Sequence, residues 1–66
     1  MLIQLNGESH DLADNATVAT LIDELKLTGK RLAVEVNEDI VPRSLHGEHR
    51  LQAGDRVEVV HAIGGG

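Results

Sequence analysis

Three consecutive glycines, Gly64 to Gly66, end the chain and have the clearest chemical potential of any residues in it. Glycine has no Cβ, so such a tail can lie extended in a narrow groove and present its terminal carboxylate without crowding. This arrangement suits an enzyme that activates the carboxylate of Gly66. The same residues could also be a frayed end or the remnant of an expression tag, because packing does not hold a terminal glycine run. The tail alone leaves these alternatives open.

Two pairs of histidines are the next candidates. His46 and His49 are three residues apart, a spacing that can bind a metal when both residues lie on one helix. Gly47 lies between them and no third ligand is evident, so a solvated loop is the favoured interpretation and we expect no metal site. His10 and His61 are expected on neighbouring strands, where a cross-strand surface pair explains them.

Hydrolytic chemistry is not expected. Ser9 and Ser44 have histidines nearby in the sequence, but a catalytic triad depends on geometry and not on proximity along the chain. A core built from 66 residues leaves no room for an active-site pocket of ordinary size, about 300 Å³ or more. We therefore expect a protein with no catalytic residues and no bound cofactor of its own.

Composition excludes further classes of function. The formal net charge is −5 and the chain contains no Phe, Tyr, Trp or Cys. A nucleic-acid-binding surface would need the opposite charge and often uses aromatic stacking, and the missing cysteines exclude disulfides and thiolate metal sites. No apolar run approaches the length of a membrane span, and residues 1–6 do not resemble a signal peptide. We expect a cytoplasmic protein that binds neither nucleic acid nor membrane.

The first half of the chain predicts a β-hairpin followed by one helix. Residues 1–5 alternate in polarity as a strand does, and Asn6-Gly7 is the strongest short signal for a hairpin turn into a second strand over 8–12. Thr17 then has the character of a helix N-cap. The apolar residues after it follow helical spacing, with Gly29 expected to end the helix. These apolar residues are Val18, Leu21, Ile22 and Leu25.

The second half predicts more strands and completes the fold. Strands are expected over 32–36, 40–41 and 56–61, with a turn at 37–39 and Pro42 ending the short middle strand. Residues 44–50 are expected to be irregular or to form one helical turn. A right-handed crossover would place the last strand beside the first. The expected fold is α+β: a ubiquitin-like β-grasp with a mixed four- to five-stranded sheet and one main helix across one face.

We expect one domain over residues 1–63 and a flexible tail over 64–66. If Val57 and Val59 face the helix, Leu2 and Val60 point to the other side of the sheet. With Ile63 they could form a docking patch close to the tail. They could equally be ordinary exposed aliphatic residues.

Taken together, these features make the chain resemble the ThiS-type sulfur carrier proteins, which serve synthesis of the thiamine thiazole ring. The resemblance covers essentially the whole chain, and the tail is its most specific mark, although such tails need only two glycines. The matching segments are Met1 to Gly7, Ala16 to Val18 with Leu21, Ile22 and Leu25, Ala33 to Asn37 with Ile40 to Arg43, Gly54-Asp55 with Val57 to Val60, and Gly64 to Gly66.

The resemblance implies a protein co-substrate and not an enzyme. An E1-like adenylating enzyme would use ATP to activate the Gly66 carboxylate, and a persulfide donor would convert it to a thiocarboxylate. Thiazole synthase would then take the sulfur, with Gly64 and Gly65 allowing the tail to enter both enzymes. The alternatives are a β-grasp carrier for molybdopterin synthesis, a protein modifier joined to lysines through Gly66, and a plain β-grasp recognition module.

Overall fold

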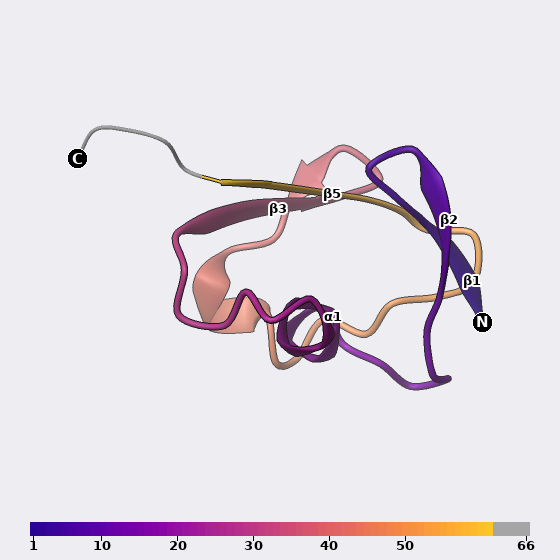
Figure 1. The fold of residues 1–66 in the computed structure, drawn as a ribbon, viewed down its shortest axis with the longest axis horizontal. Helices are drawn as coiled ribbons and strands as arrows, with labels where there is room; N and C mark the ends of the chain where they lie inside the picture. Colours follow the sequence, from indigo (N-terminus) through magenta and orange to yellow (C-terminus); the bar gives the residue numbers. More distant parts are fainter. Residues whose placement is uncertain (62–66) are drawn as a thin grey trace.

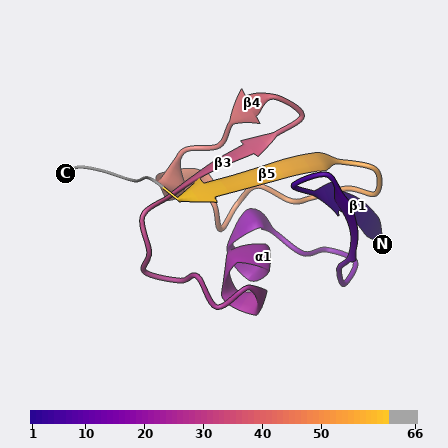
Figure 2. The same cartoon turned by 45° about the horizontal axis from the view of Figure 1, so that its top comes forward.

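Five strands form one mixed sheet, and a short helix packs across one of its faces (Figures 1 and 2). The computed structural model describes residues 1–61. The strand order in the sheet is β2-β1-β5-β3-β4. In chain order the elements are β1 (Leu2–Leu5), β2 (Glu8–Asp11), α1 (Val18–Glu24), β3 (Leu32–Val36), β4 (Asp39–Ile40), the 3-10 helix η1 (Arg43–Leu45) and β5 (Arg56–His61).

The last strand lies at the centre of the sheet. β5 runs parallel to β1 and antiparallel to β3, which confirms the predicted crossover and the β-grasp arrangement. Val57 and Val59 of β5 are buried, whereas Val60 is exposed on the opposite face. β1 pairs only with the beginning of β5, at Arg56 and Val57, so within the sheet the last residues of the strand pair with β3 alone.

Two asparagines at hairpin turns also attach the edges of the sheet to β5. Asn6 has φ of 50° and Gly7 has φ of 86°, as the predicted turn requires. The Asn6 side chain extends the ladder, because its amide oxygen accepts from Val59 N at 2.9 Å and its amide nitrogen donates to Val59 O at 3.3 Å. Asn37 plays a similar part at the next hairpin, where its side-chain oxygen accepts from Arg56 N at 3.0 Å.

Replacing Asn6 with Asp tests this second role of the turn residue. Aspartate retains the acceptor but loses the donor, and it places negative charge beside the carbonyl of Val59. We expect Asn6→Asp to lower the free energy of unfolding by about 1–2 kcal/mol. Asn15→Asp is the matched control, since Asn15 is exposed, also has positive φ and makes no side-chain hydrogen bond within residues 1–61. Urea unfolding of both variants measures the difference, and equal losses would contradict the role assigned to the Asn6 amide.

The helix begins where the sequence predicts but ends earlier. Thr17 is the N-cap, and it forms a reciprocal capping box with Thr20. The helix ends at Glu24 and not near Gly29, because Lys26 adopts the left-handed conformation with φ of 60°. Lys26 N donates to Asp23 O and Leu27 N donates to Ile22 O, the two hydrogen bonds of a Schellman motif. The expectation that Gly29 stops the helix was wrong, since lysine occupies the position that glycine usually takes.

The core between α1 and the sheet is wholly aliphatic. No polar or charged residue is buried within residues 1–61. Val41 contributes to this core and donates its N–H to Val34 O, although β4 ends one residue earlier than predicted. The buried residues are Ile3, Leu12, Ala16, Val18, Leu21, Ile22, Val34, Val36, Val41, Leu51, Val57 and Val59.

Candidate functional site

The end of β5 is the point from which the predicted functional tail departs. β5 ends at His61, which pairs with Leu32 at the start of β3. Because β5 and β3 are antiparallel, the end of β5 lies beside the start of β3. The predicted site residues Gly64, Gly65 and Gly66, together with Ile63, lie outside the described residues.

The two other predicted docking residues are exposed on the same face but do not form one patch. Leu2 is 60% exposed and Val60 is 54% exposed, both on the face away from α1. Leu2 O accepts from Gly54 N at 2.8 Å, so Leu2 lies beside the beginning of β5 and Val60 near its end. At roughly 3.3 Å per residue along a strand, about 20 Å separates them. Leu2 and Val60 are therefore not neighbours, and only Val60 lies near the end of β5; with Ile63 outside the described residues, the docking surface stays a prediction.

The histidine pairs have structural surroundings that the sequence did not reveal. His10 and His61 are not on neighbouring strands, because β1 lies between β2 and β5. His10 instead faces α1, with Nε2 at 3.9 Å from Glu24 Oε1. The prediction of a cross-strand pair was therefore wrong, since β5 inserts beside β1 and not beside β2.

The segment containing His46 and His49 caps the start of α1. The carbonyl oxygens of His46 and His49 accept from Ala19 N at 2.9 Å and Val18 N at 3.0 Å, which satisfies two N–H groups of the first helical turn. The His46 ring lies 3.1 Å from Val41 O through Nε2. Within residues 1–61 no group of three or more potential metal ligands comes together. The fold thus gives the His46 and His49 backbones a capping role and gives the His46 ring a hydrogen-bonding partner.

The serine candidates also lack catalytic geometry. Ser9 and His10 are consecutive residues of β2, so their side chains point to opposite faces of the sheet. Ser44 lies in η1, and the nearby His46 ring is directed to a backbone carbonyl. Neither serine is therefore paired with a histidine that could act as its base.

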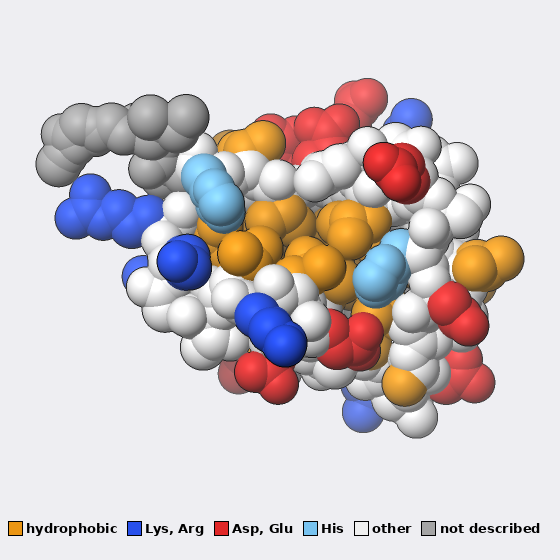
Figure 3. All heavy atoms as spheres, viewed as in Figure 1, with side chains coloured by type: hydrophobic (Ala, Val, Ile, Leu, Met, Phe, Trp, Pro, Cys, Tyr) orange, Lys and Arg blue, Asp and Glu red, His pale blue; other side chains and the backbone are white. Residues whose placement is uncertain are grey.

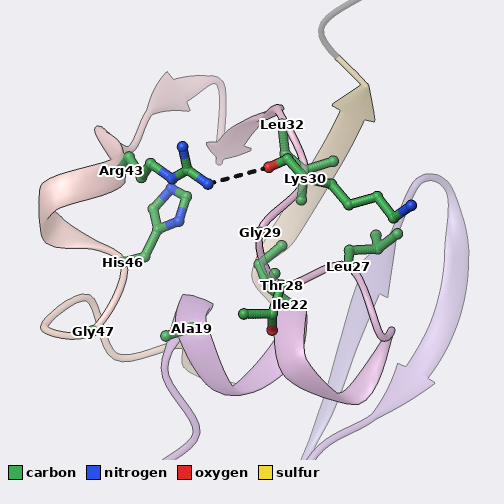
Figure 4. A pocket seen from close by; sticks show the side chains of 10 residues that line it. All are labelled: Ala19, Ile22, Leu27, Thr28, Gly29, Lys30, Leu32, Arg43, His46 and Gly47. Atoms are coloured by element: carbon green, nitrogen blue, oxygen red, sulfur yellow. Dashed lines mark hydrogen bonds between the residues drawn. The ribbon is translucent and has the colours of Figure 1, made fainter.

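A pocket of about 280 Å³ opens between α1, η1 and the loop that leads into β3 (Figure 4). No local pattern in the sequence predicts this pocket. Its apolar lining includes Ile22, Leu27 and Leu32, and its polar lining includes Lys30, Arg43 and His46. Arg43 donates through Nη2 to Lys30 O at 3.3 Å, which joins η1 to the loop across the pocket. The early end of α1 makes this pocket possible, because residues 27–31 leave the helix axis and form one wall.

Charge is distributed unevenly over the surface. Lys and Arg side chains gather at the end of the molecule from which the tail leaves, whereas most Asp and Glu side chains lie elsewhere (Figure 3). At the opposite end, the Met1 ammonium donates to Asp11 Oδ1 at 3.2 Å and lies 3.4 Å from Asp14 Oδ1. The pKa of this ammonium is raised above its usual value, and the main cause is the hydrogen bond to Asp11.

None of the helices within residues 1–61 is long and apolar enough to cross a membrane.

Comparison with known proteins identifies the family. The ThiS family model matches residues 3–66. The chain is 33% identical to the sulfur carrier protein ThiS of Bacillus subtilis, over 98% of this chain and 100% of that protein. It is 32% identical to the sulfur carrier protein ThiS of Escherichia coli over the full length of both. A crystal structure of the thiamine biosynthesis protein ThiS from Geobacter metallireducens has a TM-score of 0.86, with 28% identity and full coverage of both chains.

Longer relatives carry the same segment within a larger protein. The chain is 42% identical to part of a thiazole synthase from Magnetococcus marinus and 38% identical to part of one from Paramagnetospirillum magneticum. It spans 20% of the length of each of these two proteins. The full-length matches, the family model and the shared fold agree, and the chain belongs to the ThiS family of sulfur carrier proteins in thiamine biosynthesis.

Proposed function

We propose that the chain carries sulfur as a thiocarboxylate on Gly66 and donates it to thiazole formation. The observation that carries this proposal is the family match over residues 3–66, which includes the terminal glycines. The family consists of carriers and not enzymes, in agreement with the pattern expected from the sequence. The chemistry therefore belongs to partner enzymes, and the chain supplies the carboxylate and the surface that they bind.

The proposed loading begins with adenylation. A carboxylate is a poor electrophile until one of its oxygens becomes part of a leaving group. The Gly66 carboxylate attacks the α-phosphate of ATP on an adenylating partner, which forms an acyl-adenylate and releases pyrophosphate. A persulfide sulfur then attacks the acyl carbon and AMP leaves, which gives an acyl disulfide. A thiol reduces this disulfide, and the thiocarboxylate remains on Gly66.

Thiazole synthase is the partner proposed to accept the sulfur. In two thiazole synthases, a segment similar to this chain forms part of the same polypeptide. This fusion in one polypeptide supports a functional interaction between a carrier of this family and thiazole synthase. The thiocarboxylate sulfur would enter the thiazole ring as a nucleophile delivered on the glycine tail.

A transfer assay distinguishes this function from the related carrier for molybdopterin. The chain is loaded with radiolabelled sulfur and divided between thiazole synthase with its small-molecule substrates and the large subunit of molybdopterin synthase with its precursor. We expect label in the thiazole product only. Label in the molybdopterin product alone would keep the carrier chemistry and overturn the proposed acceptor.

Val60 is proposed to contact a partner that encloses the tail. It lies next to the last residue of β5, and its 54% exposure leaves an aliphatic side chain available on the outer face. We expect Val60→Asp to raise the KM for adenylation at least about fivefold, because an aspartate in an apolar contact must be desolvated. Leu2→Asp should have a smaller effect, since Leu2 lies about 20 Å away along the sheet. Equal effects of the two variants, or no effect of Val60→Asp, would contradict a contact at Val60.

A further inference from the structure

The pocket beside the exit of the tail combines an apolar floor with a cationic rim. Ile22, Leu27 and Leu32 supply the apolar floor, and Arg43 and Lys30 supply the positive charge. Arg43 comes from η1 and its guanidinium faces the Lys30 carbonyl, whereas the Lys30 ammonium, on the loop before β3, points away from Arg43 (Figure 4). No carboxylate within residues 1–61 forms an ion pair with either side chain. The pocket therefore offers both apolar and positively charged surface to a ligand.

This positive rim contrasts with the rest of the molecule. The chain carries a net charge of −5, yet none of the acidic side chains in the described part of the chain lines the pocket. The charge is reversed on the outer face of the sheet, where Glu35 of β3 lies directly opposite Glu58 of β5. The tail thus leaves from the cationic end of an acidic protein (Figure 3).

The position of the pocket ties it to the tail. Leu32 lines the pocket and also pairs with His61, the last residue of β5. Residues 62–66 connect His61 to the Gly66 carboxylate, and at about 3.4 Å per extended residue this connection spans no more than about 17 Å. An enzyme that holds the Gly66 carboxylate in its active site must therefore cover the surface around the end of β5. That surface includes the rim of this pocket.

Covering the rim imposes a chemical requirement on the enzyme. A lysine or arginine that is buried at an interface without a counter-charge is strongly destabilising. An enzyme that covers Arg43 and Lys30 must present carboxylates to them, and the apolar floor accepts an aliphatic side chain beside such a carboxylate. A net-acidic carrier with one cationic end would also be oriented on approach by an acidic entrance, with its tail toward the active site.

We propose that this pocket is a docking site for an acidic loop of the adenylating enzyme, one that bears an aliphatic side chain next to a carboxylate. The inference rests on the proposed function, because it takes the adenylating enzyme as the first partner to enclose the tail. Beyond that function, the inference names the surface of the carrier that this enzyme recognises and the negative charge that the entrance to the enzyme's active site must carry.

Charge reversal at the rim tests the proposal with the full chain, ATP and the adenylating enzyme. We expect Lys30→Glu and Arg43→Glu each to raise the KM for adenylation about tenfold, with kcat changed less than about twofold. The matched control is Arg56→Glu, which makes the same change of charge at the beginning of β5, and its KM should change less than about twofold. Thermal unfolding of each variant checks that it is folded; Lys30 is exposed and its side chain makes no hydrogen bond within residues 1–61.

Ionic strength supplies a second readout. The KM of the wild-type chain should rise with added salt, and the KM of Lys30→Glu should rise less, because the screened attraction is already lost. Equal effects of Lys30→Glu and Arg56→Glu would overturn the proposal, since they would reflect net charge alone. If the wild-type chain is adenylated and the KM of both rim variants is unchanged, the docking site is overturned and the carrier function stands. Failure of the wild-type chain to be adenylated would overturn the carrier function and this inference together.

Discussion

Removal of Gly66 is expected to abolish sulfur loading while leaving the stability of the protein nearly unchanged. The carboxylate that remains belongs to Gly65 and lies one residue, or about 3.4 Å, short of the reacting atoms in the adenylating enzyme. A misplacement of about 1 Å already costs two orders of magnitude in rate when reacting groups must be aligned. We expect pyrophosphate release to fall at least about a hundredfold in the deleted chain.

The fold provides the reason for unchanged stability. Each buried core residue and each strand pairing of the described sheet lies within residues 1–61, and β5 is complete at His61. The melting temperature of the deleted chain should therefore remain within about 2 °C of that of the wild type. Ser9→Ala is the matched control, because Ser9 is exposed on the edge strand β2 and the substitution leaves the tail and the pocket intact. Loading of the deleted chain at the wild-type rate would contradict the role of Gly66.

Replacement of Leu21 with Ala should produce a large loss of stability. Leu21 has no exposed surface and lies on the face of α1 that packs against the sheet. Leucine-to-alanine substitutions in cores cost about 2–5 kcal/mol, through lost apolar burial and the cavity that remains. A domain of this length has a total stability of only about 3–10 kcal/mol. We expect a loss of about 3 kcal/mol and a fall in melting temperature of about 15 °C or more.

Leu2→Ala is the matched control for that experiment. The chemical change is the same, but Leu2 is 60% exposed on the outer face of β1. Its loss should be at most about 0.5 kcal/mol, as for other surface substitutions. Chemical unfolding followed by circular dichroism measures both variants. Similar losses for Leu21→Ala and Leu2→Ala would mean that the core does not lie between α1 and the sheet.

The order of the elements could be predicted because local signals and the core pattern agree. Asn6-Gly7 requires positive φ at both residues, and Thr17 precedes an apolar helical stripe, so the first hairpin and the start of α1 were visible in the sequence. The alternation of Val57 and Val59 with exposed neighbours likewise identified β5 and its inner face. The helix and the strands each have an apolar face, and packing the two-turn helix on the mixed sheet buries both.

The remaining features depend on contacts between distant segments. Lys26 ends the helix in a conformation for which glycine is the usual residue, so nothing local marked that position. The separation of Leu2 from Val60 follows from the register of β1 against β5, which no local pattern specifies. The pocket depends on the early end of α1, because the loop after Lys26 faces η1 there. The positive charge of Lys30 and Arg43 was visible in the sequence, but their approach across one pocket was not.

The intact mass of the protein tests the central claim most directly. It is measured for the chain purified from cells that make it, and again after incubation with ATP, the adenylating enzyme, a persulfide donor and a thiol. The carrier function predicts a gain equal to the mass of sulfur minus that of oxygen, located in the C-terminal fragment and lost when Gly66 is deleted. A mass that stays constant under every loading condition would contradict the carrier function and indicate a β-grasp module that acts through recognition alone.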